Sequence, residues 1–440
     1  MRPRTAESTL SRFRQAVYQS LGRRKDTLFE LMGAALVSPG PANLVHLSLT
    51  APFRRRWPSA CDALADGQVS PARCRALVHR YRPEPPAPAR PLWAGDGTVW
   101  PRPAAVTGPA RTYGHFASPG IPQDSPIVGW EYEWLFELPA VGGSWVLPLD
   151  VERRAPGRGR PTEVAVGQLR AAWARRPPGA ARPVALYDSG YDPVQFARAE
   201  LPLDVLVRLR TRRKFLGPPG PYRGRGPRPK HGPAFKLWDA STHPPPARSA
   251  EIEDPTRGRV RVEAWPDQHV QGAHDAPFTA VRVRAERLPR RARSPQPLWL
   301  AWVGRELPEA LPDLWRWYTA RFTAERGFRF LKQDLGWTTV RPSHPEAADR
   351  WSWLLALALW QLWLARDVVA DRRLPWERPP PAGRLTPGRV RRALALELSR
   401  VGTPARPVRR RGISPGRRPG QCPGPRTRHP VARRRPKRVA

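Results

Sequence analysis

Apolar residues at helical spacing mark the start of the chain. Leu10, Phe13, Val17 and Leu21 follow one another at intervals of three or four, and a second apolar run covers Leu28–Val37. Such spacing places the apolar side chains on one face of a helix. We therefore expect two helices here, each with a buried face.

The segment DALADGQVSPARCRALVHRY, residues 62–81, predicts a helix, a turn at Gly67 and a second helix. Ser70 is suited to cap the second helix, and Pro71 is suited to its first position. We therefore expect residues 1–81 to form a helical domain. The two helices are compatible with a DNA-binding helix-turn-helix and equally with a small helical bundle that makes no DNA contact.

Residues 82–91, RPEPPAPARP, are predicted to be a linker, and the pattern then changes to that of an α/β domain. PTEVAVGQLRAAWARR (161–176) is typical of a helix. Strands are expected in LWAGDGT (92–98), IVGWEYEWLFEL (127–138), SWVLPLDVERR (144–154), PVALYDSGYD (183–192) and LDVLVRLRTRRK (203–214). The first of these strands is expected to end at Asp96, and the fourth, an apolar run typical of a buried parallel strand, at Asp188.

Residues 213–305 have a less regular pattern, with a basic Gly/Pro-rich loop and strand-like pieces such as RVRVEAW, FTAVRVRAE and PLWLAWV. A helix is expected from Asp313 to a stop at Gly336, and another from Pro345. The apolar run Trp351–Ala365 within the latter is too short for a typical membrane span, so it predicts a buried core helix.

The charge of the chain points to a polyanionic partner. Lys and Arg number 76 against 37 Asp and Glu, a formal net charge of +39. Nucleic acid is the favoured partner, and an acidic membrane surface is the alternative. The three cysteines lie far apart, which argues against zinc ligation and a disulfide framework. Without an apolar segment behind Met1, we expect no secretion signal and a cytoplasmic protein.

The tail of the chain, residues 371–440, is rich in Pro, Arg and Gly and contains no acidic residue after Glu397. This composition predicts a disordered basic tail.

The stretch YTARFTAERGFRFLK (318–332) arranges four polar residues in one row. At about 100° per residue, Tyr318, Arg321, Glu325 and Lys332 fall within roughly 60° of one another on a helix. Aromatic residues flank the row on both sides, which favours a row facing a cleft. The alternative is a solvated helix with an Arg321–Glu325 pair at i, i+4.

Three acids are candidates for metal binding: Asp96 and Asp188 at predicted strand ends, and Glu325 on the helix. Carboxylates from a sheet edge and a helix can hold two divalent cations for in-line phosphoryl transfer. Oxygen ligands favour Mg²⁺ or Mn²⁺ over zinc.

The spacing Tyr-x2-Arg-x3-Glu-x6-Lys, met by Tyr318, Arg321, Glu325 and Lys332, resembles the signature of a large group of bacterial insertion-sequence transposases with a DDE catalytic triad. GDGTVWPRP around Asp96 and LYDSGYDP around the second aspartate are similar to that group's aspartate motifs. GPRPKHG also resembles part of its insertion region. The resemblance covers roughly residues 90–370.

The resemblance implies a ribonuclease-H-like catalytic core over residues 92–370, interrupted by a mostly β insertion at about 213–305. It implies Asp96, Asp188 and Glu325 as catalytic residues that bind two Mg²⁺ or Mn²⁺ ions, with Asp192 as the alternative second aspartate. It also implies contacts to DNA phosphates from the other members of the row, Tyr318, Arg321 and Lys332.

The expected activity is a DNA transposase that cleaves transposon ends and transfers them to target DNA. Synapsis of two ends implies a homodimer, and the expected location is the bacterial cytoplasm, at the nucleoid. The alternatives are a stand-alone ribonuclease-H-like nuclease and a non-catalytic DNA-binding protein derived from a transposase.

Two further groups are candidates for DNA contact. The loop residues Arg223, Arg225, Arg228 and Lys230, with His231, could bind the backbone, or they could be solvated. Some transposases of this group stack a flipped base on a tryptophan of the insertion. The residues considered for that role are Trp238, Trp265, Trp299 and Trp302, and core packing is the alternative for each.

Overall fold

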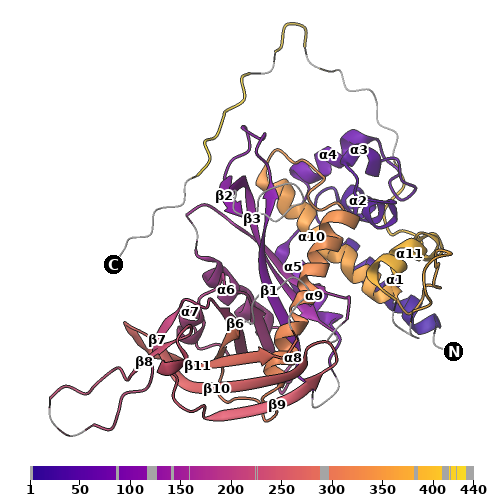
Figure 1. Ribbon diagram of the computed structural model, residues 1–440. Coiled ribbons are helices and arrows are strands. Elements are labelled where there is room, and N and C mark those ends of the chain that lie inside the picture. The colour runs from indigo at the N-terminus through magenta and orange to yellow at the C-terminus, as the bar shows by residue number, and fades with distance from the viewer. Residues whose placement is uncertain are drawn as a thin grey trace.

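The computed structural model places a long mixed sheet beside a group of helices (Figure 1). The described residues are 3–85, 89–115, 126–139, 143–157, 159–222, 224, 226–287, 297–380, 385–408, 416, 418–422 and 424–432.

Within these residues the strands form one twelve-stranded mixed sheet. The strands are β1 (Leu92–Pro101), β2 (Thr112–His115), β3 (Pro126–Leu138), β4 (Leu147–Arg154), β5 (Val184–Tyr187), β6 (Asp204–Leu209), β7 (Lys214–Leu216), β8 (Ala234–Lys236), β9 (Arg248–Asp254), β10 (Gly258–Val270), β11 (Ala273–Ala285) and β12 (Leu298–Val303). Their order is β2-β3-β1-β5-β6-β12-β11-β10-β7-β8, with β4 beside β3 and β9 beside β10. The predicted α/β class is confirmed.

One end of this sheet mixes antiparallel and parallel pairing. β1 pairs antiparallel with β3, and β3 with β4, whereas β1, β5 and β6 run parallel. The prediction of a buried parallel strand before Asp188 is therefore confirmed. The expected end of the first strand at Asp96 is wrong, because antiparallel pairing continues to Pro101, which lies opposite Gly129.

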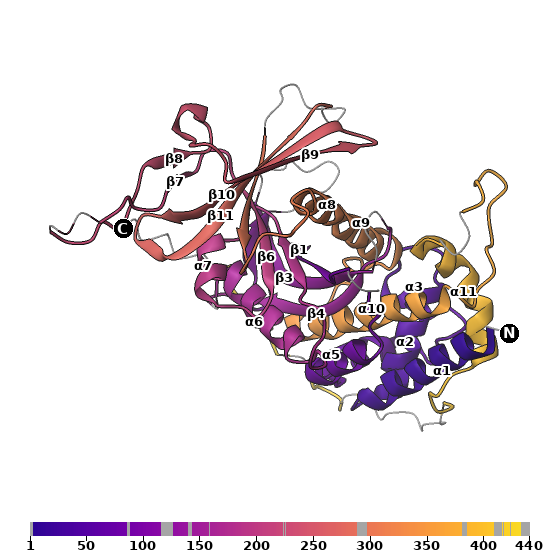
Figure 2. The same cartoon turned by 90° about the horizontal axis from the view of Figure 1, so that it is seen from below.

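The strands β7 to β12 all lie between Lys214 and Val303, in the segment predicted as a mostly β insertion. β12 pairs antiparallel with β6, so this segment extends the same sheet. Figure 2 shows β9, β10 and β11 projecting away from the N-terminal helices.

The helices are α1 (Pro3–Ser20), α2 (Lys25–Val37), α3 (Leu44–Leu47), α4 (Trp57–Asp66), α5 (Pro71–Arg80), α6 (Pro161–Trp173), α7 (Pro193–Arg198), α8 (Asp313–Ala320), α9 (Phe322–Arg329), α10 (Pro345–Ala365) and α11 (Pro387–Val401). A short 3₁₀ turn covers Ala240–Thr242, and a π-helical turn, Phe330–Asp334, follows α9. As predicted, Ser70 caps α5 by accepting the N–H of Arg73, and Gly336 follows the π turn with φ +72°.

Helix α10 is the central helix of the molecule. It contacts β4 of the sheet and also α1, α2, α4, α5 and α11. Figure 2 shows it between the sheet and the N-terminal helices. Its run Trp351–Ala365 is mostly buried, as the sequence predicts. Among the described helices, none has both the length and the apolar character needed to cross a lipid bilayer.

The prediction of a disordered tail over 371–440 is wrong for Pro387–Val401, which forms α11. Val390, Leu394 and Leu398 of this helix are buried, and the helix packs on α2 and α10. A buried apolar face stabilises this helix despite the basic composition around it.

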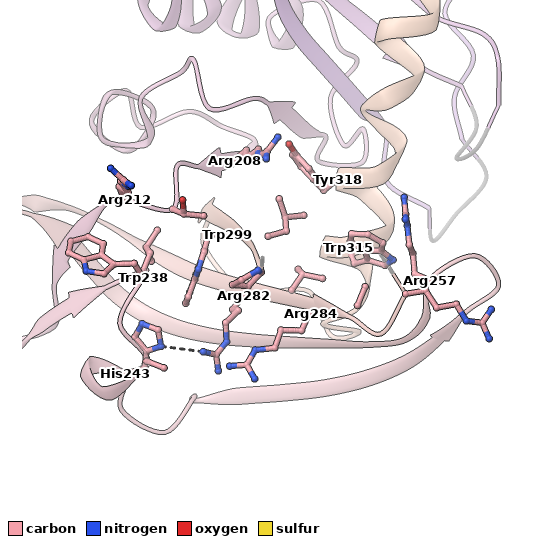
Figure 3. A pocket seen from close by; sticks show the side chains of 18 of the residues that line it. Arg208, Arg212, Trp238, His243, Arg257, Arg282, Arg284, Trp299, Trp315 and Tyr318 are labelled. Atoms are coloured by element: carbon pink, nitrogen blue, oxygen red, sulfur yellow. Dashed lines mark hydrogen bonds between the residues drawn. The ribbon is translucent and has the colours of Figure 1, made fainter. Parts of the chain in front are cut away.

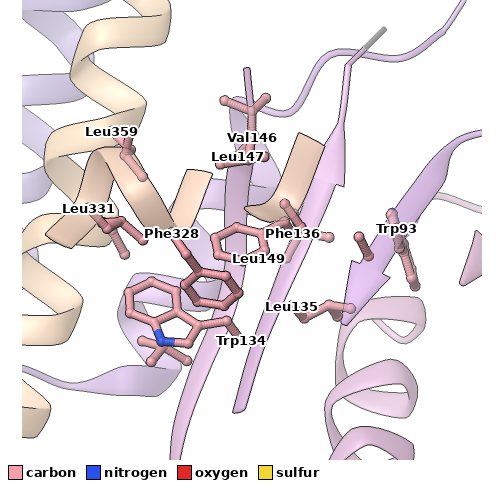
Figure 4. Close-up of a cluster of buried hydrophobic side chains, with 14 of the residues drawn as sticks. Trp93, Trp134, Leu135, Phe136, Val146, Leu147, Leu149, Phe328, Leu331 and Leu359 are labelled. Carbon is pink, nitrogen blue, oxygen red and sulfur yellow. The ribbon is translucent and has the colours of Figure 1, made fainter. Parts of the chain in front are cut away.

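Helix α9 is held on the sheet by aromatic packing (Figure 4). The ring of Phe328 meets Trp134 edge-on at 6.3 Å and Phe136 at 5.2 Å between centroids. A Cβ added to Gly327 would collide with Val146, so the helix can approach this closely only because residue 327 has no side chain. This packing fixes the helix turn that begins at Glu325 against β3 and β1.

Candidate active site

Asp96 lies in the middle of β1, between β3 and β5. Its Oδ1 accepts the N–H of Gly97 at 2.9 Å. A Cβ on Gly95 would collide with the ring of Tyr187, and a Cβ on Gly97 would lie 3.1 Å from the Glu133 carboxylate. The two glycines therefore let side chains of neighbouring strands pack directly on the backbone beside the aspartate.

Asp188 directly follows β5, where Oδ1 accepts the N–H of Gly190 at 2.8 Å. β5 runs parallel to β1 with Ala94 opposite Leu186. Asp96 and Asp188 each follow this pair by two residues, so the parallel register brings the two aspartates side by side at the end of β5.

Asp192, the alternative second aspartate, has a different role. It is the N-cap of α7, and its Oδ1 accepts the N–H of Val194 at 3.1 Å. Its own N–H donates to the hydroxyl of Thr162. These contacts assign Asp192 to helix capping, which leaves Asp188 as the second aspartate of the candidate site.

The predicted row lies on α8, α9 and the π turn. Arg321 joins α8 to α9 with helical backbone angles, so the chain continues in one direction. Tyr318 and Arg321 are buried, Lys332 is half-buried, and the Glu325 side chain is 54% exposed. The row thus begins in the protein interior, and Glu325 is its most exposed member.

Arg321 brings the candidate acids together. Its Nη1 lies 3.3 Å from Oδ2 of Asp96, and its Nη2 lies 3.1 Å from Oε1 of Glu325. Burial opposes the charge of this guanidinium, but Tyr318 and all three acids, Asp188 included, outweigh it and raise the pKa. β1 and α9 therefore meet at one side chain, and the charge of Asp188, in the loop after β5, also acts on it.

The neighbouring acids affect the pKa of Asp96. Burial raises the pKa of its carboxyl to about 6; Arg321 opposes this rise, whereas Asp188 and Glu325 add to it. Ionising the Asp96 carboxyl in this site costs free energy, and a nearby cation would stabilise the ionised carboxylate.

Lys332 lies on the same side of β1 as Asp96. Its Nζ donates to the hydroxyl of Thr98 at 2.7 Å, and it lies over the rings of Phe328 and Trp337. Burial lowers its pKa to about 8, with Asp96 acting in the opposite direction.

The aromatic residues that flank the row have two different surroundings. On one side, Phe328 packs in the core and Trp317 stacks on Trp302 at 6.1 Å between ring centroids. On the other side, Trp315 and Phe322 line a pocket together with Tyr318 of the row.

This pocket has a volume of about 960 Å³ and lies between α8 and the strands β11 and β12 (Figure 3). Its described lining contains arginines and aromatic rings but no acidic residue. The arginines are Arg208, Arg212, Arg257, Arg282, Arg284 and Arg287. A pocket of this composition suits a negatively charged ligand with flat rings, such as a nucleic-acid strand.

The pocket arginines are not among the residues predicted for DNA contact, although Arg208, Arg282 and Arg284 alternate with apolar residues in two predicted strands. That alternation is the signal that Arg282 and Arg284 share one face of β11. Arg208 is level with Leu300 and Val281 and lies on the other face of the sheet. The alternation does not indicate which other elements of the chain pack against either face of the sheet.

The candidate tryptophans separate by exposure. Trp265, Trp299 and Trp302 are buried, at 1–2% exposure, whereas Trp238 is 55% exposed. Trp238 and Trp299 both line the pocket. The ring of Trp238 has a free surface, unlike those of the three buried tryptophans.

The basic loop between β7 and β8 extends away from the body of the molecule (Figure 1). Arg228 and Lys230 are exposed there, and the guanidinium of Arg228 lies over the ring of Tyr222. At the base of the loop, Nδ1 of His231 lies 2.9 Å from Nε2 of His269 on β10. The predicted residues Arg223 and Arg225 lie outside the described residues.

Within the described part of the chain, no group of three or more His, Cys, Asp and Glu side chains is close enough to hold one metal ion. Arg321 lies among the three candidate acids and supplies the positive charge there. The oxygen-only donor set of Asp96, Asp188 and Glu325 fits hard cations such as Mg²⁺ and Mn²⁺.

Comparison with known proteins identifies the family. The sequence has no significant match among curated proteins. The model of one protein family, described as DDE superfamily endonuclease, matches residues 16–272. That match covers more than half of the chain and includes Asp96 and Asp188. The match indicates a DDE-type, transposase-like protein that acts on DNA. The chain belongs to the DDE superfamily endonuclease family.

Proposed function

We propose that this chain is a DNA transposase that cleaves the ends of its own insertion sequence and joins them to target DNA. The observation that carries the proposal is that Arg321 pairs with both Asp96, at 3.3 Å, and Glu325, at 3.1 Å, while the charge of Asp188 acts on the same guanidinium. These acids come from three separate elements of a chain that belongs to an endonuclease family. The remaining elements of the proposal rest on this site.

The proposed catalytic domain is a ribonuclease-H-like core over residues 92–370. The strand order β4-β3-β1-β5-β6, with β5 and β6 parallel to β1, supports this assignment. The strands β7 to β12 form the proposed insertion at about 213–305. We keep residues 1–81 as a helical domain and 82–91 as the linker that precedes the core.

Two Mg²⁺ or Mn²⁺ ions, bound by Asp96, Asp188 and Glu325, would activate the attacking oxygen and stabilise the leaving oxygen of the scissile phosphate. The raised pKa of Asp96, which burial causes and the two other acids increase, supports a site that requires additional positive charge. The half-exposed side chain of Glu325 leaves the site open on the helix side.

The proposed role of the protein's own residues is to hold the DNA backbone. We infer that Lys332, which donates to the hydroxyl of Thr98, and Arg321 bind phosphates on either side of the scissile bond, with the hydroxyl of Tyr318 as a further donor. Arg321 would exchange its carboxylate partners for a phosphate when cations occupy the site.

The arginine-lined pocket supports DNA as the substrate, because it adjoins Tyr318 and offers aromatic surface as well as charge. The loop residues Arg223, Arg225, Arg228 and Lys230 are proposed to bind the backbone outside this pocket. The loop lies on the insertion, and the insertion supplies most of the residues that line the pocket, so we assign the insertion to DNA binding.

Three activities are distinguished by one assay. The protein is incubated with Mg²⁺, plasmid and a labelled duplex from the end of its element, which inverted repeats flanking the coding region would define. Joined product supports a transposase. Cutting without joining supports a stand-alone nuclease, and a gel shift alone supports a non-catalytic DNA-binding protein.

Glu325→Gln is the decisive variant in this assay, since it removes a charge and preserves size. We expect it to abolish cutting and to leave DNA binding largely intact. Glu346→Gln is the matched control, because Glu346 is also an exposed helix residue near an arginine, Arg153 at 3.4 Å. Equal cutting by wild type and Glu325→Gln would contradict the proposal.

The remaining parts of the proposal follow from the reaction. Strand transfer of two ends requires that both be held at once, so we propose a homodimer in the synaptic complex. A bacterial insertion sequence would place the protein in the cytoplasm, at the nucleoid. Sedimentation of the protein with and without end DNA tests the dimer.

A further inference from the structure

A hydrogen bond between two buried residues lies on the other face of β1 from Asp96. The hydroxyl of Tyr191 donates to Oε2 of Glu133 at 2.5 Å. Glu133 is 3% exposed and Tyr191 is 6% exposed. Neither residue belongs to the proposed set of metal ligands, yet each is joined to one of the two aspartates.

Tyr191 belongs to the loop that carries Asp188. The backbone N–H of Tyr191 points to the carbonyl of Asp188 at 3.4 Å, which closes a turn between them. The ring of Tyr191 packs at 4.5 Å from that of Tyr187 and faces Phe196 at 6.4 Å. The tyrosine therefore fixes the loop between β5 and α7.

Glu133 belongs to the strand that supports Asp96. It lies opposite Gly97 in the β1–β3 pairing, and a Cβ at residue 97 would lie 3.1 Å from its carboxylate. Its backbone carbonyl accepts from Gln168 of α6, and the guanidinium of Arg154 lies 3.5 Å from its carboxylate. Glu133 is thus held on three sides and has little freedom to follow a moving partner.

We propose that Tyr191 and Glu133 are positioning residues that set the separation between Asp188 and Asp96. The hydrogen bond joins the loop of Asp188 to β3, and β3 holds β1 through continuous pairing on either side of Asp96. This inference rests on the proposed function, since it takes the two aspartates as metal ligands.

The physical consequence concerns metal affinity. Two carboxylates bind the same pair of cations well only if their oxygens are held at the correct separation before the cations arrive. Without the tyrosine hydroxyl the rings still pack, but the loop of Asp188 gains freedom that cation binding must then remove. Loss of such supporting hydrogen bonds typically costs about tenfold or more in metal affinity.

Tyr191→Phe is the test variant, because it deletes one oxygen and retains the ring. Mn²⁺ binding to the full-length protein is measured by calorimetry, and the Mg²⁺ dependence of cutting is measured in parallel. We expect Tyr191→Phe to weaken Mn²⁺ binding about tenfold and to raise the Mg²⁺ concentration for half-maximal cutting by a similar factor. The rate at saturating Mg²⁺ and the affinity for end DNA without metal should change much less.

Tyr18→Phe is the matched control, since Tyr18 also donates to a carboxylate, that of Asp26 at 2.7 Å, and lies in the N-terminal helices. It should leave Mn²⁺ binding unchanged. Glu133→Gln retains an oxygen acceptor for the Tyr191 hydroxyl, so it should bind Mn²⁺ nearly as well as wild type, whereas Glu133→Ala should resemble Tyr191→Phe.

Unchanged Mn²⁺ binding by both Tyr191→Phe and Glu133→Ala would overturn the inference. The inference would also be overturned if Tyr18→Phe weakened Mn²⁺ binding as much as Tyr191→Phe, because the effect would then be a general loss of stability. A wild-type protein that binds no Mn²⁺ and cuts no DNA would instead contradict the proposed function. The two failures are therefore distinguishable.

Discussion

Lys332 donates a hydrogen bond to the hydroxyl of Thr98 at 2.7 Å, which joins the π turn after α9 to the strand of Asp96. The lysine lies four residues after Phe328, whose ring anchors α9 on the sheet. The helix of Glu325 is thus attached to β1 close to the candidate site. The arrangement holds the basic side chain of Lys332 beside the strand that carries Asp96.

Lys332→Ala should weaken binding of end DNA, because it removes one cation at the proposed phosphate site. The slope of log affinity against log salt should fall by about one unit, as expected for one lost phosphate contact. Affinity measured between low and moderate salt tests this. Lys25→Ala is the control, since Lys25 is also half-buried over an aromatic ring, that of Tyr18. An unchanged slope for Lys332→Ala would exclude a phosphate contact.

Gly327→Ala should separate α9 from the sheet, since the added Cβ would collide with Val146. We expect a loss of stability of about 1–3 kcal/mol and a large loss of cutting as Glu325 is displaced. Adding Val146→Ala should restore much of the activity.

Gly167→Ala in α6 is the control for this change, since a Cβ there meets nothing within 4 Å. It should stabilise the protein by about 0.5–1 kcal/mol through the lower entropy of the unfolded chain. Thermal unfolding and the cutting assay measure both changes. Full activity in Gly327→Ala would show that close packing of α9 is not required.

Asp188→Asn and Asp192→Ala should have opposite effects. The first should abolish cutting with little change in stability, because Asp188 is proposed as a metal ligand. The second should lower stability by about 1 kcal/mol, the usual effect of losing an N-cap, and retain cutting. If Asp192→Ala abolished cutting while Asp188→Asn remained active, the assignment of the second aspartate would be reversed.

Glu137 should make stability depend on pH. Burial raises the pKa of this carboxyl from 4.5 to about 8, although Arg82, 3.3 Å away, and Arg176 oppose the rise. The folded state therefore holds a proton that the unfolded state releases, so the stabilising contribution is complete below pH 4.5 and is lost as pH rises towards 8.

Glu137→Gln removes this titration. The free energy of unfolding of wild type relative to Glu137→Gln should fall between pH 5 and pH 8, by up to about 1.4 kcal/mol per pH unit. Urea unfolding at pH 5, 6.5 and 8 measures the difference. A difference that does not change with pH, or that rises with it, would contradict the raised pKa.

The regular elements were largely predictable from local patterns. The continuous apolar run before Asp188 gave a buried parallel strand, and Trp351–Ala365 gave a buried helix, because both are buried on all sides. β1 extends beyond its predicted end at Asp96, and Gly95 and Gly97 lie within it. Their role depends on Tyr187 and Glu133, side chains that other parts of the chain supply.

Helix α11 was missed although its signal was present. Val390, Leu394 and Leu398 recur at helical spacing, but the surrounding arginines and prolines favoured disorder. The row of α8 and α9 was predictable from periodicity, whereas the contact of Arg321 with Asp96 joins residues 225 positions apart. A contact of that range depends on the sheet order, which no local pattern contains.

The central claim is that Asp96, Asp188 and Glu325 bind a pair of divalent cations. Anomalous diffraction from a crystal of the protein with end DNA and Mn²⁺ tests it most directly. We expect two Mn²⁺ peaks about 3.5–4 Å apart, each bound by carboxylate oxygens of these residues, with Arg321 turned towards a phosphate. Mn²⁺ bound elsewhere, or three acids that still surround Arg321 with no ion between them, would contradict it.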